Sequence, residues 1–359
     1  MDVLFNMQKI RFATLDNLFQ NHNRHIYNDS TVHVFINMES ILRKVTSGKI
    51  DDHIKANRDG EKDFISNIFN IAAHYRLYFN KSRINSKIYL YMGHSFKAKY
   101  RNEEYIDNYR EPYNMKFTKD TNGKYVGNMV NNTIETIKTI FTYIEGVYFL
   151  SSDYLEPSVI PKVISSSFGE KDYGLIITTD PYDYQYVNHK FDVIRAKGNN
   201  SYYVNDTNVI QILKKEYKVV TKETCPSIYT PFILSFLDDR LRNIKGIPRV
   251  GVGTVIKSIH NGISQGLISD SSFNFNMLNP IINDTIIDQL RLNFLCVDVQ
   301  SQYQLATSSM IAPILDQLQD LFDESSLKKI NENYFTNNPM MIMEIQPLIN
   351  KPKKNIFGV

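Results

Sequence analysis

The chain has 359 residues, of which 42% are hydrophobic and 12% aromatic, enough to bury the core of one large domain or two modest ones. Lys and Arg (41) exceed Asp and Glu (38) by only three, which excludes a uniformly basic surface, so any contact with phosphate must come from locally clustered cations. Cys225 and Cys296 form no CxxC motif and no zinc-type spacing, which is typical of a reducing compartment. The sequence contains no apolar run of about 18 residues and no signal-peptide pattern, so we expect a soluble cytoplasmic protein without a membrane span.

The first half of the chain alternates between strand and helix patterns. Residues 1–30 are polar and weakly patterned, and we interpret them as an N-terminal extension. Residues 32–36 alternate as a strand and precede a helix from about Glu39, and residues 62–79 have a helical pattern before a β-rich run over 87–92. This alternation predicts an α/β fold with a central, mostly parallel sheet flanked by helices.

An excursion interrupts the alternation, which then resumes. Residues 95–125 are dense in Lys, Arg and Tyr and have little apolar periodicity. A helix is predicted over 130–144, a strand over 146–150, a helix over 157–165 and a strand over 173–178. The sequence therefore predicts a third strand–helix–strand unit, whose last strand ends at polar residues.

From residue 231 to about 335 the pattern is helical, and it contains one glycine-punctuated segment. Gly251 and Gly253 allow a tight turn, so that the amides opening a helix at Thr254 could face a phosphate, with Lys257 one turn later. This pattern favours a helix–hairpin–helix that binds nucleic acid. The alternative is a glycine-rich turn between packed helices.

Residues 238–251 resemble the helix–hairpin–helix of the 5′ nuclease family, which includes phage 5′ exonucleases and flap endonucleases and has a PIN/FEN-like fold with a helical arch. They read Asp-Asp-Arg-Leu-Arg-Asn-Ile-Lys-Gly-Ile-Pro-Arg-Val-Gly, with Asp239 at one metal-binding position and Arg242 where a second Asp is expected. Segments in the family's order extend the resemblance over about 31–335. Together with an Asn-, Ile-, Lys- and Tyr-rich composition without Trp, typical of an AT-rich genome, the resemblance suggests a phage protein acting in the host cytoplasm.

The resemblance also identifies candidate metal ligands. Asp180 matches the family's strand-end Thr-Asp-x-Asp segment, Asp183 lies one place beyond the second acid, and Glu156 remains of a Glu-Ala-Asp-Asp-Val stretch. The other expected carboxylate positions hold Asn37, His94, Ser158, Val159, Tyr182 and Arg242. His94 could ligate a softer metal or act as a base, but a lone His at a strand end is more often structural.

Two-metal phosphodiester hydrolysis needs several carboxylates around ions about 4 Å apart. Glu156, Asp180 and Asp239, with Asp183 as a fourth ligand, could hold one Mg²⁺ or Mn²⁺ ion. Arg242 would instead pair with the remaining acids. The sequence therefore predicts a degenerate active site, with no catalytic residue assigned beyond these residual candidates.

The chain matches the family more closely at the nucleic-acid-binding positions than at the metal-ligand positions. The 95–125 excursion matches the family's arch, through which a single strand passes; aromatic rings there could stack on bases while cations hold phosphates. A solvated loop is the alternative. The candidate DNA-binding residues are Lys97, Lys99, Arg101, Tyr109, Arg110, Lys245, Gly251, Gly253, Thr254 and Lys257.

We therefore expect four parts: the extension 1–30, a PIN/FEN-like domain over 31–230, a helical region over 231–335 and a basic tail over 336–359. The predicted function is that of a degenerate 5′ nuclease-like protein that binds flap, branched or single-stranded DNA in replication, repair or transcription. One alternative is an active metal-dependent 5′ nuclease, flap endonuclease or ribonuclease-H-like enzyme; another is a partner protein of a polymerase complex. The tail could dock a replication or transcription protein.

Overall fold

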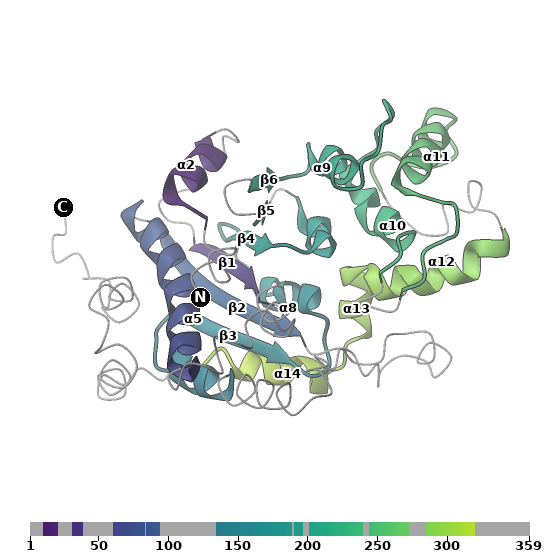
Figure 1. Cartoon of the computed structure of the whole chain (residues 1–359). Coiled ribbons are helices and arrows are strands. Elements are labelled where there is room, and N and C mark those ends of the chain that lie inside the picture. Colours follow the sequence, from purple (N-terminus) through teal and green to yellow (C-terminus); the bar gives the residue numbers. More distant parts are fainter. Residues whose placement is uncertain are drawn as a thin grey trace.

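The structure is a computed structural model, and it describes residues 10–20, 31–38, 60–82, 84–93, 134–188, 190–196, 201–239, 244–272 and 284–319. A six-stranded sheet with the strand order β3-β2-β1-β4-β5-β6 lies at its centre (Figure 1). The first five strands are parallel, and β6 pairs antiparallel with β5. The strands are β1 (Thr31–Asn37), β2 (Asn85–Gly93), β3 (Val147–Ser152), β4 (Tyr173–Thr178), β5 (Phe191–Arg195) and β6 (Tyr202–Val204).

The predicted α/β fold with a mostly parallel sheet is confirmed. Strands β1 to β4 lie where the sequence predicts them, whereas β5 and β6 were not predicted. The helices, with η for 3-10 turns, are α2 (Phe12–Gln20), α5 (Gly60–Lys81), η1 (Pro157–Val159), α8 (Ile160–Ser165), η2 (Pro181–Tyr186), α9 (Val209–Glu216), η4 (Ser227–Tyr229), α10 (Thr230–Ser235), α11 (Val252–Ser264), α12 (Asp284–Val297), α13 (Val299–Leu305) and α14 (Ser308–Asp316). Residues 134–141 are also helical, within the predicted 130–144.

Alternation along the strands divides the core into two layers. Val34 and Ile36 of β1 face an aliphatic layer with α5, whereas Phe35 between them faces an aromatic layer with Tyr91 and α8. All of these side chains are buried. The sheet is therefore the middle of three layers, which is how a parallel sheet buries both of its faces.

Part of the expected N-terminal extension joins this core. Ile10 and Leu15 are buried in the aliphatic layer. The Ile10 amide donates to the Tyr75 hydroxyl of α5 (3.3 Å), and the Phe12 ring lies 4.6 Å, centroid to centroid, from the His74 ring. Helix α2 is thus docked on α5.

The C-terminal helices cover the aromatic layer. Helices α10, α11 and α12 group together on the side of the sheet opposite α5 (Figure 1). The chain then returns to β3, because the Gln317 side chain after α14 accepts from the Ser151 amide (2.8 Å) and donates to the Ser151 carbonyl (3.0 Å). Across the described ranges, no helix has the length and apolar character needed to cross a bilayer.

Candidate functional site

The carboxyl ends of β1, β2, β3 and β4 meet at one edge of the sheet because these strands are parallel. The β3–η1 loop is pressed against the end of β2: a Cβ on Gly93 would lie 2.5 Å from Pro157 Cδ and 2.6 Å from the Leu155 carbonyl oxygen. Only glycine fits at this close approach. It brings Glu156, which is buried, to the same edge as Asn37 at the end of β1.

Asp183 lies at the centre of this edge and is fully buried. Its Oδ2 accepts hydrogen bonds from the Asn37 side-chain amide (3.1 Å) and from the Tyr91 hydroxyl (3.2 Å). Burial, followed by the charge of Asp183, raises the pKa of Tyr91 well above its ordinary value, so this tyrosine stays a proton donor. Two neutral donors therefore hold the carboxylate.

The turn after β4 explains why Asp183, rather than residue 182, faces this edge. Asp180 caps η2: its Oδ1 accepts from the Tyr182 amide (3.0 Å), and its own amide donates to Thr178 Oγ1 (2.9 Å). The 3-10 turn that follows buries both Tyr182 and Asp183. The turn thus buries Asp183, one residue beyond the position where the resemblance expects an acid.

The other predicted ligands lie around the same edge but form no ligand group. Glu156 precedes η1, and Asp239 forms a backbone bridge with Ile244, their amides and carbonyls pairing at 2.9 Å. Within the described residues, no three His, Cys, Asp or Glu side chains form a group that could hold a metal ion, and Glu156, Asp180, Asp183 and Asp239 are all described. The described part of the chain therefore does not supply the ligand group that a divalent ion needs.

Tyr217, which the sequence did not indicate, feels the charges of both Asp180 and Asp239. Burial raises the pKa of this tyrosine, and the charges of Glu216, Asp180 and Asp239 raise it further. Its ring remains 40% exposed. Tyr217 is therefore an accessible aromatic group beside the candidate site.

A partly buried hydrogen-bond network fixes the neighbouring edge. Glu216 Oε1 accepts from Arg195 Nε (2.9 Å), from the Tyr184 hydroxyl (2.7 Å) and from the Tyr202 hydroxyl. These residues come from β5, η2, β6 and α9, separated by up to 32 positions, so no local sequence pattern could reveal them. The network anchors the end of α9, and with it Tyr217, to the sheet.

The glycine-punctuated segment forms a hairpin that leads into α11. The helix begins at Val252, two residues before the predicted start, and the Thr254 amide, which was predicted to face a phosphate, donates to the Gly251 carbonyl (3.0 Å). Gly251 has an extended backbone (φ −105°), and the left-handed residue of the turn is Arg249 (φ 65°), so neither predicted glycine makes the tight turn. Gly253 serves packing, because a Cβ there would lie 2.8 Å from Val219 Cγ1.

The predicted DNA-binding residues of this segment lie at the surface. Lys245, Gly251, Thr254 and Lys257 are exposed, and Gly253 is half-buried. The structure thus brings a cation and a hydroxyl-bearing residue together at the start of α11. Other predicted positions lie outside the described residues: His94, Lys97, Lys99, Arg101, Tyr109, Arg110, Arg242 and the tail over 336–359.

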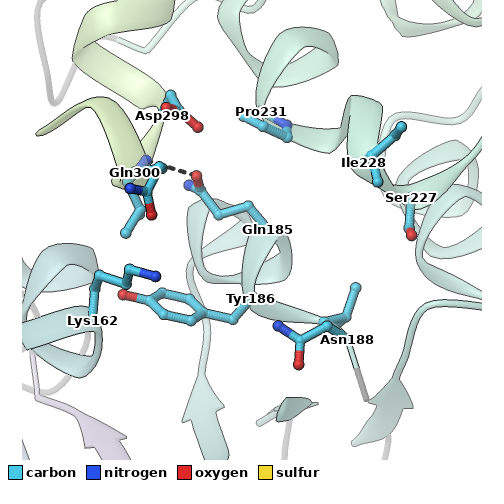
Figure 2. Close-up of a pocket in the computed structure, with 11 residues that line it drawn as sticks. Lys162, Gln185, Tyr186, Asn188, Ser227, Ile228, Pro231, Asp298 and Gln300 are labelled. Carbon is cyan, nitrogen blue, oxygen red and sulfur yellow. Dashed lines mark hydrogen bonds between the residues drawn. The ribbon is translucent and has the colours of Figure 1, made fainter. Parts of the chain in front are cut away.

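A cavity of about 320 Å³ lies on the far side of η2, between α8, α10 and the start of α13 (Figure 2). Gln185 spans it: Oε1 accepts from the Val299 amide (2.8 Å), and Nε2 donates to the Val297 carbonyl (3.1 Å). Asp298 caps α13 by accepting from the Ser301 amide (2.7 Å); burial raises its pKa, against the effects of that bond and of the Lys162 charge. Gln185 thus joins the turn carrying Asp183 to the C-terminal helices.

The fold and this edge define an α/β protein with a mostly parallel sheet, a carboxylate at the strand ends and a helical C-terminal region. In overall structure the chain is similar to the flap endonuclease of bacteriophage T5, solved as a pseudo-enzyme–product complex with DNA and metal ions, at 12% identity and a TM-score of 0.50; the match covers 80% of this chain and 98% of that one.

Two further solved structures are similar at lower scores. The T5 5′-exonuclease with bound zinc ions matches at 11% identity and a TM-score of 0.46, covering 89% of this chain and 100% of that one. Human GEN1 in complex with Holliday junction DNA matches at 10% identity and a TM-score of 0.38, covering 92% of this chain and 76% of that one. No protein-family model and no curated protein sequence matches the chain.

Proposed function

We propose that this chain is a catalytically degenerate 5′ nuclease-like protein that binds branched or single-strand-containing DNA. The observation that carries the proposal is the pair of hydrogen bonds that the Asp183 carboxylate accepts from the Asn37 side-chain amide and the Tyr91 hydroxyl. The position at the end of β1 is where the family resemblance expects an aspartate. An amide there turns a would-be pair of metal ligands into a hydrogen-bonded pair.

The chemistry of these donors supports loss of catalysis. A carboxylate that binds a divalent ion directs its lone pairs at the cation, whereas Asp183 Oδ2 already receives two hydrogens. A metal ion bound through Oδ2 would compete with both donors inside a fully buried site. It would also need further oxygen ligands, since a divalent ion of this kind takes about six. Asn37 and Tyr91 thus stabilise the acid without a metal.

Retention of DNA binding is supported by the hairpin that precedes α11. The hairpin is fixed by the Asp239–Ile244 bridge, and the exposed side chains of the hairpin and of the helix start include Lys245, Thr254 and Lys257. Phosphate contacts of this kind need cations and backbone amides but no metal ligands. A protein of this kind can therefore keep DNA binding after it has lost the ability to cleave DNA. The similar T5 structure contains DNA, which is the ligand proposed here.

The test is a cleavage assay followed by a binding assay. End-labelled 5′-flap DNA is incubated with the purified protein in Mg²⁺ and then Mn²⁺, beside an Asp180→Ala control, and the products are resolved on a denaturing gel. We expect intact DNA together with a shifted band on a native gel. Cleavage that Asp180→Ala abolishes would make the chain an active nuclease and overturn the proposal.

The native gel decides between binding and a role as a partner protein. If the flap DNA stays intact and does not shift at saturating protein, the chain has lost DNA binding and acts through protein contacts instead. A shift that weakens in Lys257→Ala, with an unchanged melting temperature, would support the α11 contact. Lys171→Ala is the matched control, because that exposed lysine precedes β4 at the opposite edge of the sheet.

A further inference from the structure

The turn that follows α9 combines exposed apolar and basic side chains. In this 217–222 turn, Val220 is 99% exposed and Tyr217 40% exposed. They are two of the five exposed large hydrophobic residues in the described part of the chain, and they lie within four positions of each other. Lys218 and Lys222 flank Val220 and are exposed as well. An aliphatic side chain left wholly in water between two cations is a surface feature that burial in the fold does not explain.

The turn is held in place by hydrogen bonds and is not a loose excursion. The Val219 amide donates to the Lys214 carbonyl (2.8 Å), and the Tyr217 amide donates to the Leu213 carbonyl (3.0 Å), which together end α9. Lys214 Nζ also donates to the Thr221 carbonyl (3.4 Å). The exposed side chains are therefore presented on a fixed backbone, which lowers the entropy cost of a contact through them.

Packing joins this turn to the start of α11. Val219 points inward and fills the space beside Gly253, where a Cβ would lie 2.8 Å from Val219 Cγ1. The exposed side chains of Lys218, Val220 and Lys257 thus belong to neighbouring parts of one surface. At its other end the turn approaches the candidate site, since Glu216, the residue before it, accepts from the hydroxyl of Tyr184 (2.7 Å) in η2, the turn that carries Asp183.

We propose that the 217–222 turn is a second nucleic-acid contact, which continues the α11 surface toward the carboxyl edge of the sheet; this rests on the proposed DNA binding. Lys218 and Lys222 would contact backbone phosphates, while Val220 packs against sugars or an unstacked base edge. Charge complementarity favours a polyanion, because both acidic residues that flank the turn are engaged within the fold: Glu216 accepts from Arg195 Nε, and Glu223 accepts from the Thr221 hydroxyl.

The test separates the two kinds of contact by their dependence on salt. We expect Val220→Ser to weaken binding of 5′-flap DNA, measured by fluorescence anisotropy, without changing the slope of log Kd against log salt. Lys218→Gly should weaken binding by about threefold or more near 0.2 M salt and reduce that slope by about 0.9, the value for one lost phosphate contact. Leu267→Ser and Lys171→Ala are the controls, because Leu267 is 48% exposed beyond the other end of α11.

Thermal melting excludes an indirect effect of misfolding. Lys218 has a positive φ of 52°, a conformation that glycine adopts without strain, so Lys218→Gly should leave the melting temperature unchanged or raise it. A stable variant that binds less DNA cannot be explained by a structural role of the lysine.

Each outcome has one meaning. If Lys257→Ala weakens binding while Val220→Ser and Lys218→Gly bind like the unmodified protein, the 217–222 turn is not a contact, and the proposed function stands. If the unmodified protein binds no flap or single-stranded DNA, the proposed function fails and this inference fails with it. Weakened binding in both turn variants, with the two controls unaffected, supports the inference.

Discussion

At the scale of single residues, Asp183 decides what the candidate site can do. The family resemblance already indicated Asp180 and Asp183 as candidate ligands, and it indicated that Asn37 stands where an acid is expected. It could not indicate Tyr91, which reaches Asp183 from a different strand 92 positions away. Sequence patterns place acids at strand ends, but they do not show which neutral donors form hydrogen bonds with those acids.

Restoring an acid at position 37 tests this reading of the site. Asn37→Asp would place a second carboxylate about 3 Å from Asp183 Oδ2, where two like charges repel unless a cation lies between them. We expect the variant to melt at a lower temperature than the unmodified protein in EDTA, and to regain stability with millimolar Mn²⁺.

The unmodified protein and Asn37→Leu, which has no added charge, should not respond to Mn²⁺. Equal stabilisation of all three proteins by Mn²⁺ would contradict the assignment of position 37 as the missing ligand.

His33 makes stability depend on pH. Burial lowers its pKa from 6.5 to about 4, partly offset by Asp172. The unfolded chain therefore takes up a proton first as the pH falls, so the stability that neutral His33 contributes is complete above pH 6.5 and is lost as the pH falls toward 4. The loss at pH 4 is about 3 kcal/mol. Urea unfolding should show a steeper decline between pH 7 and pH 4.5 for the unmodified protein than for His33→Gln; parallel declines would contradict it.

At the scale of elements, long periodic segments were predictable and short ones were not. Alternation predicted β1, β-rich or buried apolar runs predicted β2 to β4, and a helical pattern predicted α5, because each of these segments spans six residues or more. Strand β5 has five residues and β6 three, too few for a period to stand out. The turn η2 depends on the cap by Asp180, and the hairpin before α11 depends on Arg249 in a left-handed conformation instead of the predicted glycines.

Gly174 shows how tightly these strands pack. It pairs with Phe191 of β5, and a Cβ there would lie 2.0 Å from Phe191 Cε1. Gly174→Ala should therefore displace the Phe191 ring and lower the free energy of unfolding by about 1–3 kcal/mol, measured by urea denaturation. Gly169→Ala is the control, because its Cβ would lie 3.4 Å from the nearest atom, Asp172 Oδ2. Equal stability of both variants would mean that the ring relaxes freely.

At the scale of the whole molecule, single amide side chains connect segments more than a hundred residues apart. Gln185 bonds to the backbone of Val297 and Val299 and also donates to the Tyr182 carbonyl (2.7 Å). No sequence pattern predicts such a contact, because either partner segment is unremarkable alone. The sequence could place the sheet and the C-terminal helices separately, but not the contacts that set their relative position.

Removing the hydrogen bonds of this one side chain should measurably lower the free energy of unfolding. Gln185→Ala leaves the Val299 amide and the Val297 carbonyl without that partner, so we expect a loss of about 1–3 kcal/mol in the free energy of unfolding. Gln300→Ala, at an exposed residue lining the same cavity, should change stability by less than about 0.5 kcal/mol. Comparable losses in the two variants would show that the cavity wall, and not the amide bridge, matters.

The bonds between Gln317 and Ser151 have a consequence for self-association. Strand β3 is the last strand on its side of the sheet, so its outer backbone groups could pair with a strand of another molecule. Gln317 occupies both polar groups of Ser151, and α14 lies alongside β3. A chain ending at residue 306 would fold with this edge uncovered. We expect the shortened chain to form oligomers or aggregates, detected by light scattering, at concentrations where the full chain does not. Helix α14 would then also protect the edge of β3 from pairing with other molecules.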